Sequence, residues 1–299
     1  MEFGSIIVYF TIMIGIFAIL ALGLNVQYGF SGLVNFGHVA FFAIGAYTSA
    51  IVTTAGAPFI VGIILAGLTS AMMGFLVALP TSKLSVGYWA ITTLGIGEVI
   101  RLVALNEEWL TKGSFGIEGI PQPLSKLIHI SNYPVLYLCI VWMFVGLSYF
   151  LMAKLANSPF GRVLKVIREE EDLALAMGKP VFIFKLKAMA LGATFAGISG
   201  SLYAHYITYI SPSDFTPIVT FIVWAMVIIG GKGNLAGSII GAVVIVVFFN
   251  STRYLKDFLH MRAEIVASLR MVAIGILVIL SVLYKPEGLI KEKKKTYDI

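Results

Sequence analysis

The chain has 299 residues, of which 59% are hydrophobic and 12% charged, and its formal net charge is +6. Soluble domains are about half apolar and about one quarter charged, so this composition excludes an ordinary soluble protein and predicts one that crosses a membrane several times. The single cysteine, Cys139, excludes an intrachain disulfide. No basic segment precedes the first apolar run, so we expect no cleavable signal peptide.

Nine apolar segments are candidates to cross a bilayer, which takes about 20 apolar residues. The second segment has an irregular beginning and the seventh is short, so a split or re-entrant segment would add one more. We therefore predict an all-α polytopic membrane protein with about 9–10 transmembrane helices. The predicted segments are residues 6–24, 33–52, 59–79, 86–105, 134–153, 188–206, 217–229, 235–249 and 265–284.

A charged stretch, residues 154–187, interrupts the apolar chain with seven basic and four acidic residues. Such a stretch cannot lie in hydrocarbon, because each unpaired charge there costs several kcal/mol. Its basic excess places it on the cytoplasmic side by the positive-inside rule. If the lysine-rich C-terminal tail is also inside, fourteen of the 21 basic residues face the cytoplasm, and the N-terminus is outside.

The charged stretch also has the pattern of a surface helix, or of two short ones. Ser158 and Pro159 are typical of a helix start, and Gly178 of a left-handed helix end. Leu164, Ile167, Ala174 and Leu175 recur at helical spacing, which predicts one apolar face. That face is available to a partner, unless the segment is only a solvated connector.

We predict one transmembrane domain, residues 1–299, made of two halves of opposite orientation. Residues 1–133 form the first half with an outer loop at 106–133, and residues 134–153 form a pivot helix. Residues 154–187 are cytoplasmic, and residues 188–299 form the second half and the basic tail. Each half has an irregular patch after its first segment, at residues 25–38 and 207–217. Paired interruptions of this kind indicate a transport pathway in an inverted-repeat fold.

Polar residues in or near the apolar segments are candidates for a translocation pathway. Glu98 and Arg101 lie three residues apart, so they either pair with each other or line an aqueous vestibule. In the first patch, bonding to loose backbone groups is the favoured role, and contact with a solute is the alternative. The complete candidate set is Asn35, His38, Glu98, Arg101, Ser211 and Asp214.

The sequence contains no pattern for covalent chemistry. The phosphate-binding loop GxxxxGK[ST] does not occur, and the four histidines are scattered, so we predict neither a nucleotide site nor a zinc site. A membrane-embedded enzyme would need a catalytic constellation that is not found. The glycines at 230–234 predict a tight turn, and those at 192, 197 and 200 predict close helix packing.

Several segments resemble a known family. They are GLNVQYGFSGLVNFGHVAFFAIGAY (Gly23 to Tyr47), TLGIGEVIR (Thr93 to Arg101), LTKGSFGIEGIPQP (Leu110 to Pro123), the segment from Ala176 to Tyr206, and IIGGKGNLAGSIIGA (Ile228 to Ala242). In order and spacing they are similar to the permeases of branched-chain amino acid ABC transporters, in particular the LivM type. The resemblance extends over most of the chain and is more specific for the family than for the solute.

The resemblance implies a non-catalytic permease in the cytoplasmic (inner) membrane, without a cofactor and without nucleic acid. The implied partners are a second permease of the LivH type, two ATP-binding subunits of the LivG/LivF type, and an extracytoplasmic solute-binding protein. Two alternatives stay open: a permease for urea or amides, and a stand-alone secondary transporter or channel in which Glu98 is the main candidate for ion coupling.

The resemblance also implies roles for two segments. The cytoplasmic stretch is similar to the coupling region that docks in an ATPase groove, and the outer loop is expected to meet the solute-binding protein. The coupling candidates are Phe160, Leu164, Ile167, Arg168, Glu171, Leu175 and Gly178, and the loop candidates are Gly113, Ser114, Gly116 and Gly119.

Overall fold

The computed structural model describes residues 3–81, 84–125, 133–259 and 263–292, and these residues are almost entirely helical. The two strands of the described residues, β1 (Ile117–Glu118) and β2 (Tyr209–Ile210), pair with each other in antiparallel register. The predicted all-α class is therefore confirmed. The helices assigned to the nine predicted segments are α1 (Phe3–Asn25), α2 (His38–Thr54), α3 (Phe59–Thr81), α4 (Val86–Asn106), α6 (Tyr133–Asn157), α9 (Val181–Ile207), α10 (Pro217–Gly230), α11 (Leu235–Leu259) and α12 (Ala263–Tyr284).

Six of these helices, among the residues described, are long and apolar enough to cross a membrane: α1, α3, α4, α6, α9 and α12. The shorter apolar helices are α2, α10 and the part of α11 from Leu235 to Ser251. Helix α2 has 17 residues and α10 has 14, which gives lengths of about 26 and 21 Å. Both are shorter than the hydrocarbon core of about 30 Å, because each begins only after an irregular patch.

Four predicted boundaries are wrong by four residues or more, and one of them is the end of the eighth segment, since α11 extends to Leu259 and not to residue 249. The second segment was expected to begin at residue 33, but α2 begins at His38, because residues 26–30 form a π-helix (η1, Val26–Phe30) and residues 31–37 form no regular helix. The fifth helix extends to Asn157 and the sixth begins at Val181. Charged residues at these two helix ends lie beyond the apolar segment, where water can solvate them, so the helices continue past the predicted limits.

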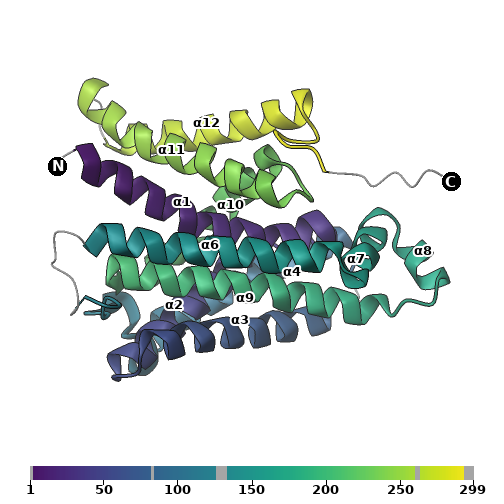
Figure 1. Ribbon diagram of the computed structural model, residues 1–299, viewed down its shortest axis with the longest axis horizontal. Coiled ribbons are helices and arrows are strands. Elements are labelled where there is room, and N and C mark those ends of the chain that lie inside the picture. Colours follow the sequence, from purple (N-terminus) through teal and green to yellow (C-terminus); the bar gives the residue numbers. More distant parts are fainter. Residues whose placement is uncertain (1–2, 82–83, 126–132, 260–262, 293–299) are drawn as a thin grey trace.

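The first helix of each half packs against helices of the other half. Helix α1 packs against α10 and α11 of the second half, while α9 packs against α2 and α3 of the first half. Figure 1 shows that α1 and α9 run in opposite directions. The two halves are therefore interlocked, and their inverted relation stays a prediction. The predicted pivot, α6, packs against α1 and leads into the charged stretch.

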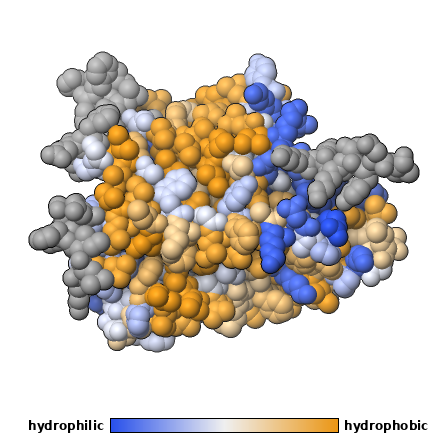
Figure 2. Space-filling model, in the orientation of Figure 1, coloured by the Kyte–Doolittle hydropathy of each residue, from blue (hydrophilic) through white to orange (hydrophobic). Residues whose placement is uncertain are grey.

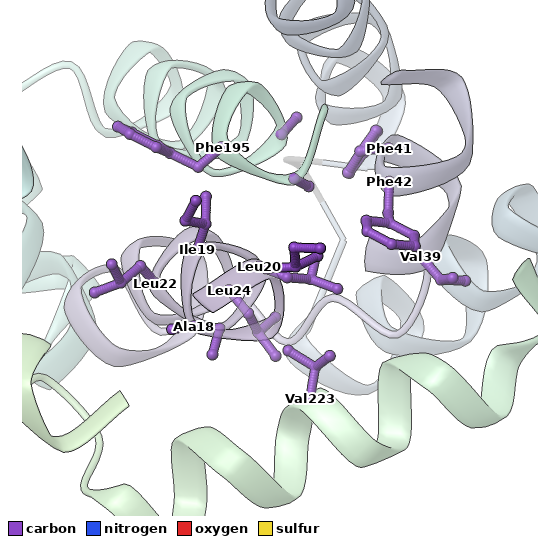
Figure 3. Close-up of a cluster of buried hydrophobic side chains, with 14 of the residues drawn as sticks. Ala18, Ile19, Leu20, Leu22, Leu24, Val39, Phe41, Phe42, Phe195 and Val223 are labelled. Carbon is purple, nitrogen blue, oxygen red and sulfur yellow. The ribbon is translucent and has the colours of Figure 1, made fainter. Parts of the chain in front are cut away.

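Helix α1 is at the centre of the core, since its residues from Ile12 to Leu24 are nearly all buried. Figure 3 shows its side chains between Phe195 of α9, Phe41 and Phe42 of α2, and Val223 of α10. Glycines let α1 and α9 approach closely: a Cβ atom on Gly23 would lie 2.6 Å from the carbonyl oxygen of Gly192, and the reverse distance is also 2.6 Å. The close-packing role predicted for the α9 glycines is confirmed.

The surface divides into an apolar face and a polar end. Figure 2 shows an apolar surface over α6, α9 and α3 and a hydrophilic band toward the end that carries the short helices α7 (Pro159–Glu169) and α8 (Glu171–Ala176). The β1–β2 pair lies at the opposite end (Figure 1). This polarity is expected of a chain that spans a bilayer. Residues 126–132 of the outer loop and 293–299 of the basic tail lie outside the described residues.

Candidate functional site

The break between α1 and α2 is organised around the Gln27 side chain in η1. Its Nε2 donates to the carbonyl oxygen of Met189 at 3.0 Å, and its Oε1 accepts from Nδ2 of Asn35 at 2.8 Å. The Asn35 Oδ1 in turn accepts from the Gly37 backbone N–H at 2.9 Å. These bonds occupy backbone groups that a broken helix leaves without partners.

His38 completes this network at the first residue of α2. Its Nδ1 lies 3.0 Å from Oε1 of Gln27, and its Nε2 lies 3.1 Å from the carbonyl oxygen of Leu20. Both partners are acceptors, so a neutral imidazole donates to one of them at a time. Gln27, Asn35 and His38 are fully buried, so the bonds made by Asn35 and His38 fit the backbone role that the sequence favoured. Contact of either with a solute stays a prediction.

Residues of the second half of the chain also bond the end of α1, just before the break between α1 and α2. The Asn25 Nδ2 donates to the carbonyl oxygen of Asn234 at 2.9 Å and to Oγ of Ser238 at 2.7 Å. The Asn25 Oδ1 accepts from the Gly233 backbone N–H at 2.9 Å. Gly231 and Gly233 have φ angles of +123° and +76°, which confirms the predicted tight turn. The bonds made by Asn25 attach this turn to the end of α1.

The charged stretch forms two short helices, as the sequence allowed. The Ser158 Oγ accepts from the Gly161 backbone N–H at 3.3 Å and caps α7, with Pro159 at its first position. Gly178, just after α8, has a φ angle of +70°, so the predicted start and end residues are both confirmed.

The predicted docking face of α7 is wrong in one respect. Leu164 is 0% exposed and Ile167 is buried as well, because α7 packs against α6, α9 and η1 of its own chain. These two side chains are therefore not available to a partner. Exposed apolar residues follow on α8 and directly after it, at Leu173, Leu175 and Met177, and again at the start of α9, at Phe182 and Ile183.

Arg168 connects α7 to the broken helix and to the C-terminal segment. It donates from Nη1 to the carbonyl oxygen of Gly29 in η1, and its Nη2 lies 2.9 Å from Oε2 of Glu292. Lys165 also pairs with Glu292, at 2.6 Å. The backbone N–H groups of residues 289 and 290 bond the carbonyl oxygens of residues 229 and 230, so the segment that carries Glu292 is itself attached to the end of α10.

Two other coupling candidates also contact their own chain. The rings of Phe160 and Phe184 stack with centroids 5.3 Å apart, and Glu171 pairs with Lys185 at 2.7 Å. Leu175 and Gly178 are exposed. The candidate set therefore divides into residues that hold α7 and α8 on the membrane domain and residues that face outward.

The second irregular patch forms a short 3₁₀ helix, η4 (Pro212–Phe215), with a capping box. The Asp214 Oδ2 accepts from the Ser211 backbone N–H at 2.8 Å and from the Ser211 Oγ at 3.1 Å. Asp214 also lines a cavity of about 230 Å³ with mostly apolar walls from α1, α2, α9, α10 and α11. Ser211 therefore orients a carboxylate at the edge of an apolar cavity. A role in translocation stays a prediction for both residues.

Glu98 and Arg101 pair with each other, which was one of the two roles predicted for them. The Arg101 Nε donates to the two carboxylate oxygens of Glu98 at 3.0 and 2.9 Å. Ile96 is the middle residue of the 21-residue helix α4, so Glu98 lies only about 3 Å beyond the helix midpoint. The side chains of Glu98 and Arg101 nevertheless keep 37% and 22% of their surface exposed.

The described part of the outer loop is folded onto the second half. After α5 (Glu108–Thr111) and the 3₁₀ turn η2 (Gly113–Phe115), β1 pairs with β2. Gly113 and Gly116 are buried with φ angles of +57° and +73°, so they shape the loop and are not a contact surface, contrary to the prediction. Ser114 and Gly119 are exposed. The aromatic rings that stand out here are those of Trp109 and Phe115, which are 81% and 84% exposed.

Comparison with known proteins identifies the family. A family model described as the permease component of branched-chain amino acid transport systems matches residues 6–282. The chain belongs to this family. The LivM permease of the high-affinity branched-chain amino acid transport system from Salmonella typhimurium is 35% identical over 92% of this chain and 68% of its own length, and that from Escherichia coli is 34% identical with the same coverage. No solved structure matches the chain.

More distant relatives support the same assignment. A probable branched-chain amino acid transport permease, LivM, from Methanocaldococcus jannaschii is 32% identical over 93% of this chain and 91% of its own length. The autoinducer 2 import permease LsrC from Escherichia coli is 26% identical over 50% of the chain. The family consists of transport-system permeases, so the chain is a multi-pass membrane permease and not an enzyme. A component of a transport system also fits the predicted subunit better than a stand-alone transporter.

Several functional candidates were missed from the sequence. Gln27 was read as part of an irregular patch, although a glutamine inside an apolar segment signals a required hydrogen-bond partner. Leu173 and Met177 gave no signal, because a periodic pattern does not show which apolar residues the chain covers. The ion pairs of Glu292 could not be predicted either, because its partners lie more than a hundred residues away in sequence.

Proposed function

We propose that the chain is a transmembrane permease subunit of an ATP-driven importer that moves branched-chain or related amino acids across the cytoplasmic (inner) membrane. The family match over residues 6–282 carries this proposal. We infer the solute from the names of the relatives. We infer that separate subunits hydrolyse ATP because this sequence has no phosphate-binding loop and its family is one component of a transport system.

Two ATP-binding subunits, of the LivG/LivF type, are the proposed source of force, and α8 is their proposed contact. Leu173, Leu175 and Met177 expose an apolar patch at the charged end of the molecule, where a groove in a partner would bury it. Movement of this patch reaches the membrane core through α7. Arg168 holds the Gly29 carbonyl of η1, and Gln27 of the same π-helix bonds Asn35, His38 and α9.

The extracytoplasmic solute-binding protein is proposed to meet the outer loop. Trp109 and Phe115 are large, exposed aromatic rings. The Phe115 carbonyl oxygen accepts from Tyr209 of β2, which follows the end of α9 that is farther from α8. Aromatic residues are enriched where proteins bind each other. Ser114 and Gly119 lie on the same exposed loop. Because β1 pairs with β2, which leads directly into η4, a protein bound here would act on the residues around Asp214.

A second permease, of the LivH type, is proposed to complete the pathway. The exposed faces of α4 and α12 leave room for it, since less than a third of either helix is buried within the chain. The pathway candidates Asn35, His38, Glu98, Arg101, Ser211 and Asp214 remain proposals in this scheme. Of these, Glu98 and Arg101 expose charge on a helix face, whereas Asn35 and His38 are enclosed.

Reconstitution tests the proposal directly. The chain is co-expressed with its partner permease, ATP-binding subunits and solute-binding protein, placed in liposomes with ATP on the side of the ATP-binding subunits, and assayed for uptake of labelled leucine. We expect uptake that needs ATP, the binding protein and every subunit. Uptake by the chain alone under an ion gradient would establish the stand-alone alternative, and urea or acetamide outcompeting leucine would change the solute.

A further inference from the structure

Helix α4 exposes one continuous stripe along the membrane-spanning part of the molecule. Tyr88, Ile91 and Leu102 are exposed apolar residues on it, and Gly95 lies between them with open space where a Cβ atom would be. With Glu98, these residues repeat at alternating intervals of three and four, which puts them on one face of a helix. The other residues that the structure describes leave this face uncovered.

A charged pair lies in the middle of this stripe. Glu98 and Arg101 are bonded to each other near the helix midpoint, yet both keep exposed surface. In hydrocarbon, even a paired charge would lose hydrogen bonds that water or a polar group supplies, so intramembrane charges almost always face a bundle interior or a water-filled cavity. The pair therefore marks a part of α4 that faces water or a polar ligand in the assembled transporter.

We propose that this face of α4 binds the head group of the transported amino acid, with the Glu98 carboxylate toward its ammonium group and the Arg101 guanidinium toward its carboxylate. An amino acid zwitterion holds its two charges next to each other on one carbon atom. A carboxylate and a guanidinium three residues apart on one helix face offer the two opposite charges next to each other, and the solute would exchange their mutual bonds for bonds to itself. Guanidinium groups bind carboxylates through two parallel hydrogen bonds.

The apolar residues of the stripe suit the rest of such a solute. Ile91, Val99 and Leu102 are exposed beside the pair and provide a surface for an aliphatic side chain. A single helix face cannot enclose a solute, so the remaining wall comes from the second permease. This inference therefore rests on the proposed function and adds to it the residues that recognise the solute.

Thiol labelling tests whether this face lines an aqueous path. In a Cys139→Ser background, Gly95→Cys in the complete transporter is treated with a membrane-impermeant, charged thiol reagent. We expect labelling that leucine slows. The control is Leu147→Cys, an exposed position in the middle of α6 on the apolar surface, which we expect to stay unlabelled. A transporter that imports leucine but labels Gly95→Cys no faster than Leu147→Cys would overturn the inference.

Charge removal tests the recognition itself. Glu98→Gln and Arg101→Gln should each raise the KM for leucine about tenfold or more, the effect of losing one charge-assisted hydrogen bond, while Glu264→Gln at the start of α12 should not. If the pair only neutralised itself, the double variant would restore the wild-type KM, because no charge would be left unpaired. We expect the double variant to be at least as impaired as either single one, and a KM within twofold of wild type would overturn the inference.

Different results would overturn the proposed function and the α4 site. If the wild-type complex shows no ATP-dependent leucine uptake, the proposed function is wrong, and labelling of Gly95→Cys still reports whether α4 faces water. If wild-type uptake is normal and the α4 variants behave as wild type, the function holds and the α4 site is wrong.

Discussion

Helices α7 and α8 are consecutive, short and drawn from the same charged stretch, yet they place their apolar residues in opposite directions. Leu164 and Ile167 of α7 are buried against α6, α9 and η1. Leu173 and Leu175 of α8 are exposed by half or more of their surface. Helical periodicity predicts that an apolar face exists in both helices, but the position of each helix on the membrane domain decides whether the chain itself covers that face.

The comparison gives the two helices different roles. Helix α7 belongs to the membrane domain, held by Arg168 to Gly29 and by Lys165 to Glu292. Helix α8 is carried on it and presents its apolar residues outward. A partner that grips α8 would therefore move α7 and the end of α1 with it.

The largest effect is expected from a charge placed on the buried side. Leu164→Asp puts an unpaired carboxylate into a fully enclosed position, which should lower the free energy of unfolding by about 4 kcal/mol or more. Leu175→Asp changes an exposed position and should leave the melting temperature of the purified permease unchanged. It should nevertheless abolish co-purification of the ATP-binding subunits.

The control for this pair is Leu289→Asp, an exposed apolar position at the same end of the molecule but outside α8. This variant should keep the wild-type melting temperature and should still co-purify with the ATP-binding subunits. The distinction between α7 and α8 would be wrong if Leu164→Asp melted like the wild type. Retention of the ATP-binding subunits by Leu175→Asp would show instead that docking uses another surface.

The same distinction explains how much of the fold the sequence predicts. Nine apolar segments, the capped cytoplasmic helices and the glycine turn follow from local pattern, because hydrophobicity, Pro159 and Gly178 act within a few residues of themselves. The start of α2 does not follow. The run from Leu33 to Phe36 is apolar except for Asn35, but it is held out of a helix by contacts with Thr93 and Trp224 from distant parts of the chain.

The candidate site was predicted less completely, for a related reason. Glu98 and Arg101 were found as a pair because their partners are each other, three residues apart. Gln27 was missed because its partners are Asn35 before α2, His38 at the start of α2 and residue 189 of α9, and sequence spacing does not predict that they meet. Sequence analysis located the polar residues but could not tell which of them the chain itself satisfies.

The same difference between enclosed and exposed groups predicts how much each polar residue contributes to stability. Gln27→Leu removes an acceptor from Asn35 and His38 and a donor from the Met189 carbonyl, all in a fully buried place. Each buried polar group left unpaired costs about 1–3 kcal/mol, so we expect a loss of about 3 kcal/mol. The loss would be seen as a lower melting temperature and a lower yield of folded permease.

The matched comparison is the double variant Glu98→Gln with Arg101→Gln. These side chains bond each other and keep exposed surface, so removing both charges should change stability by less than about 1 kcal/mol, even though transport suffers. Equal destabilisation by Gln27→Leu and by the double variant would show that the α4 pair is structural, and would remove the distinction drawn here.

The smallest effect on stability is expected at the outer loop. Trp109→Ala together with Phe115→Ala removes two rings that the chain leaves almost entirely in solvent, so the free energy of unfolding should change by less than about 0.5 kcal/mol. If the rings are anchors for the solute-binding protein, stimulation of ATP hydrolysis by the solute-loaded binding protein should nevertheless fall at least tenfold while the subunits stay assembled. Glu118→Gln, an exposed change on the adjacent strand β1, should keep that stimulation. Full stimulation in the double alanine variant would exclude these rings and require that the binding protein docks elsewhere on the outer surface.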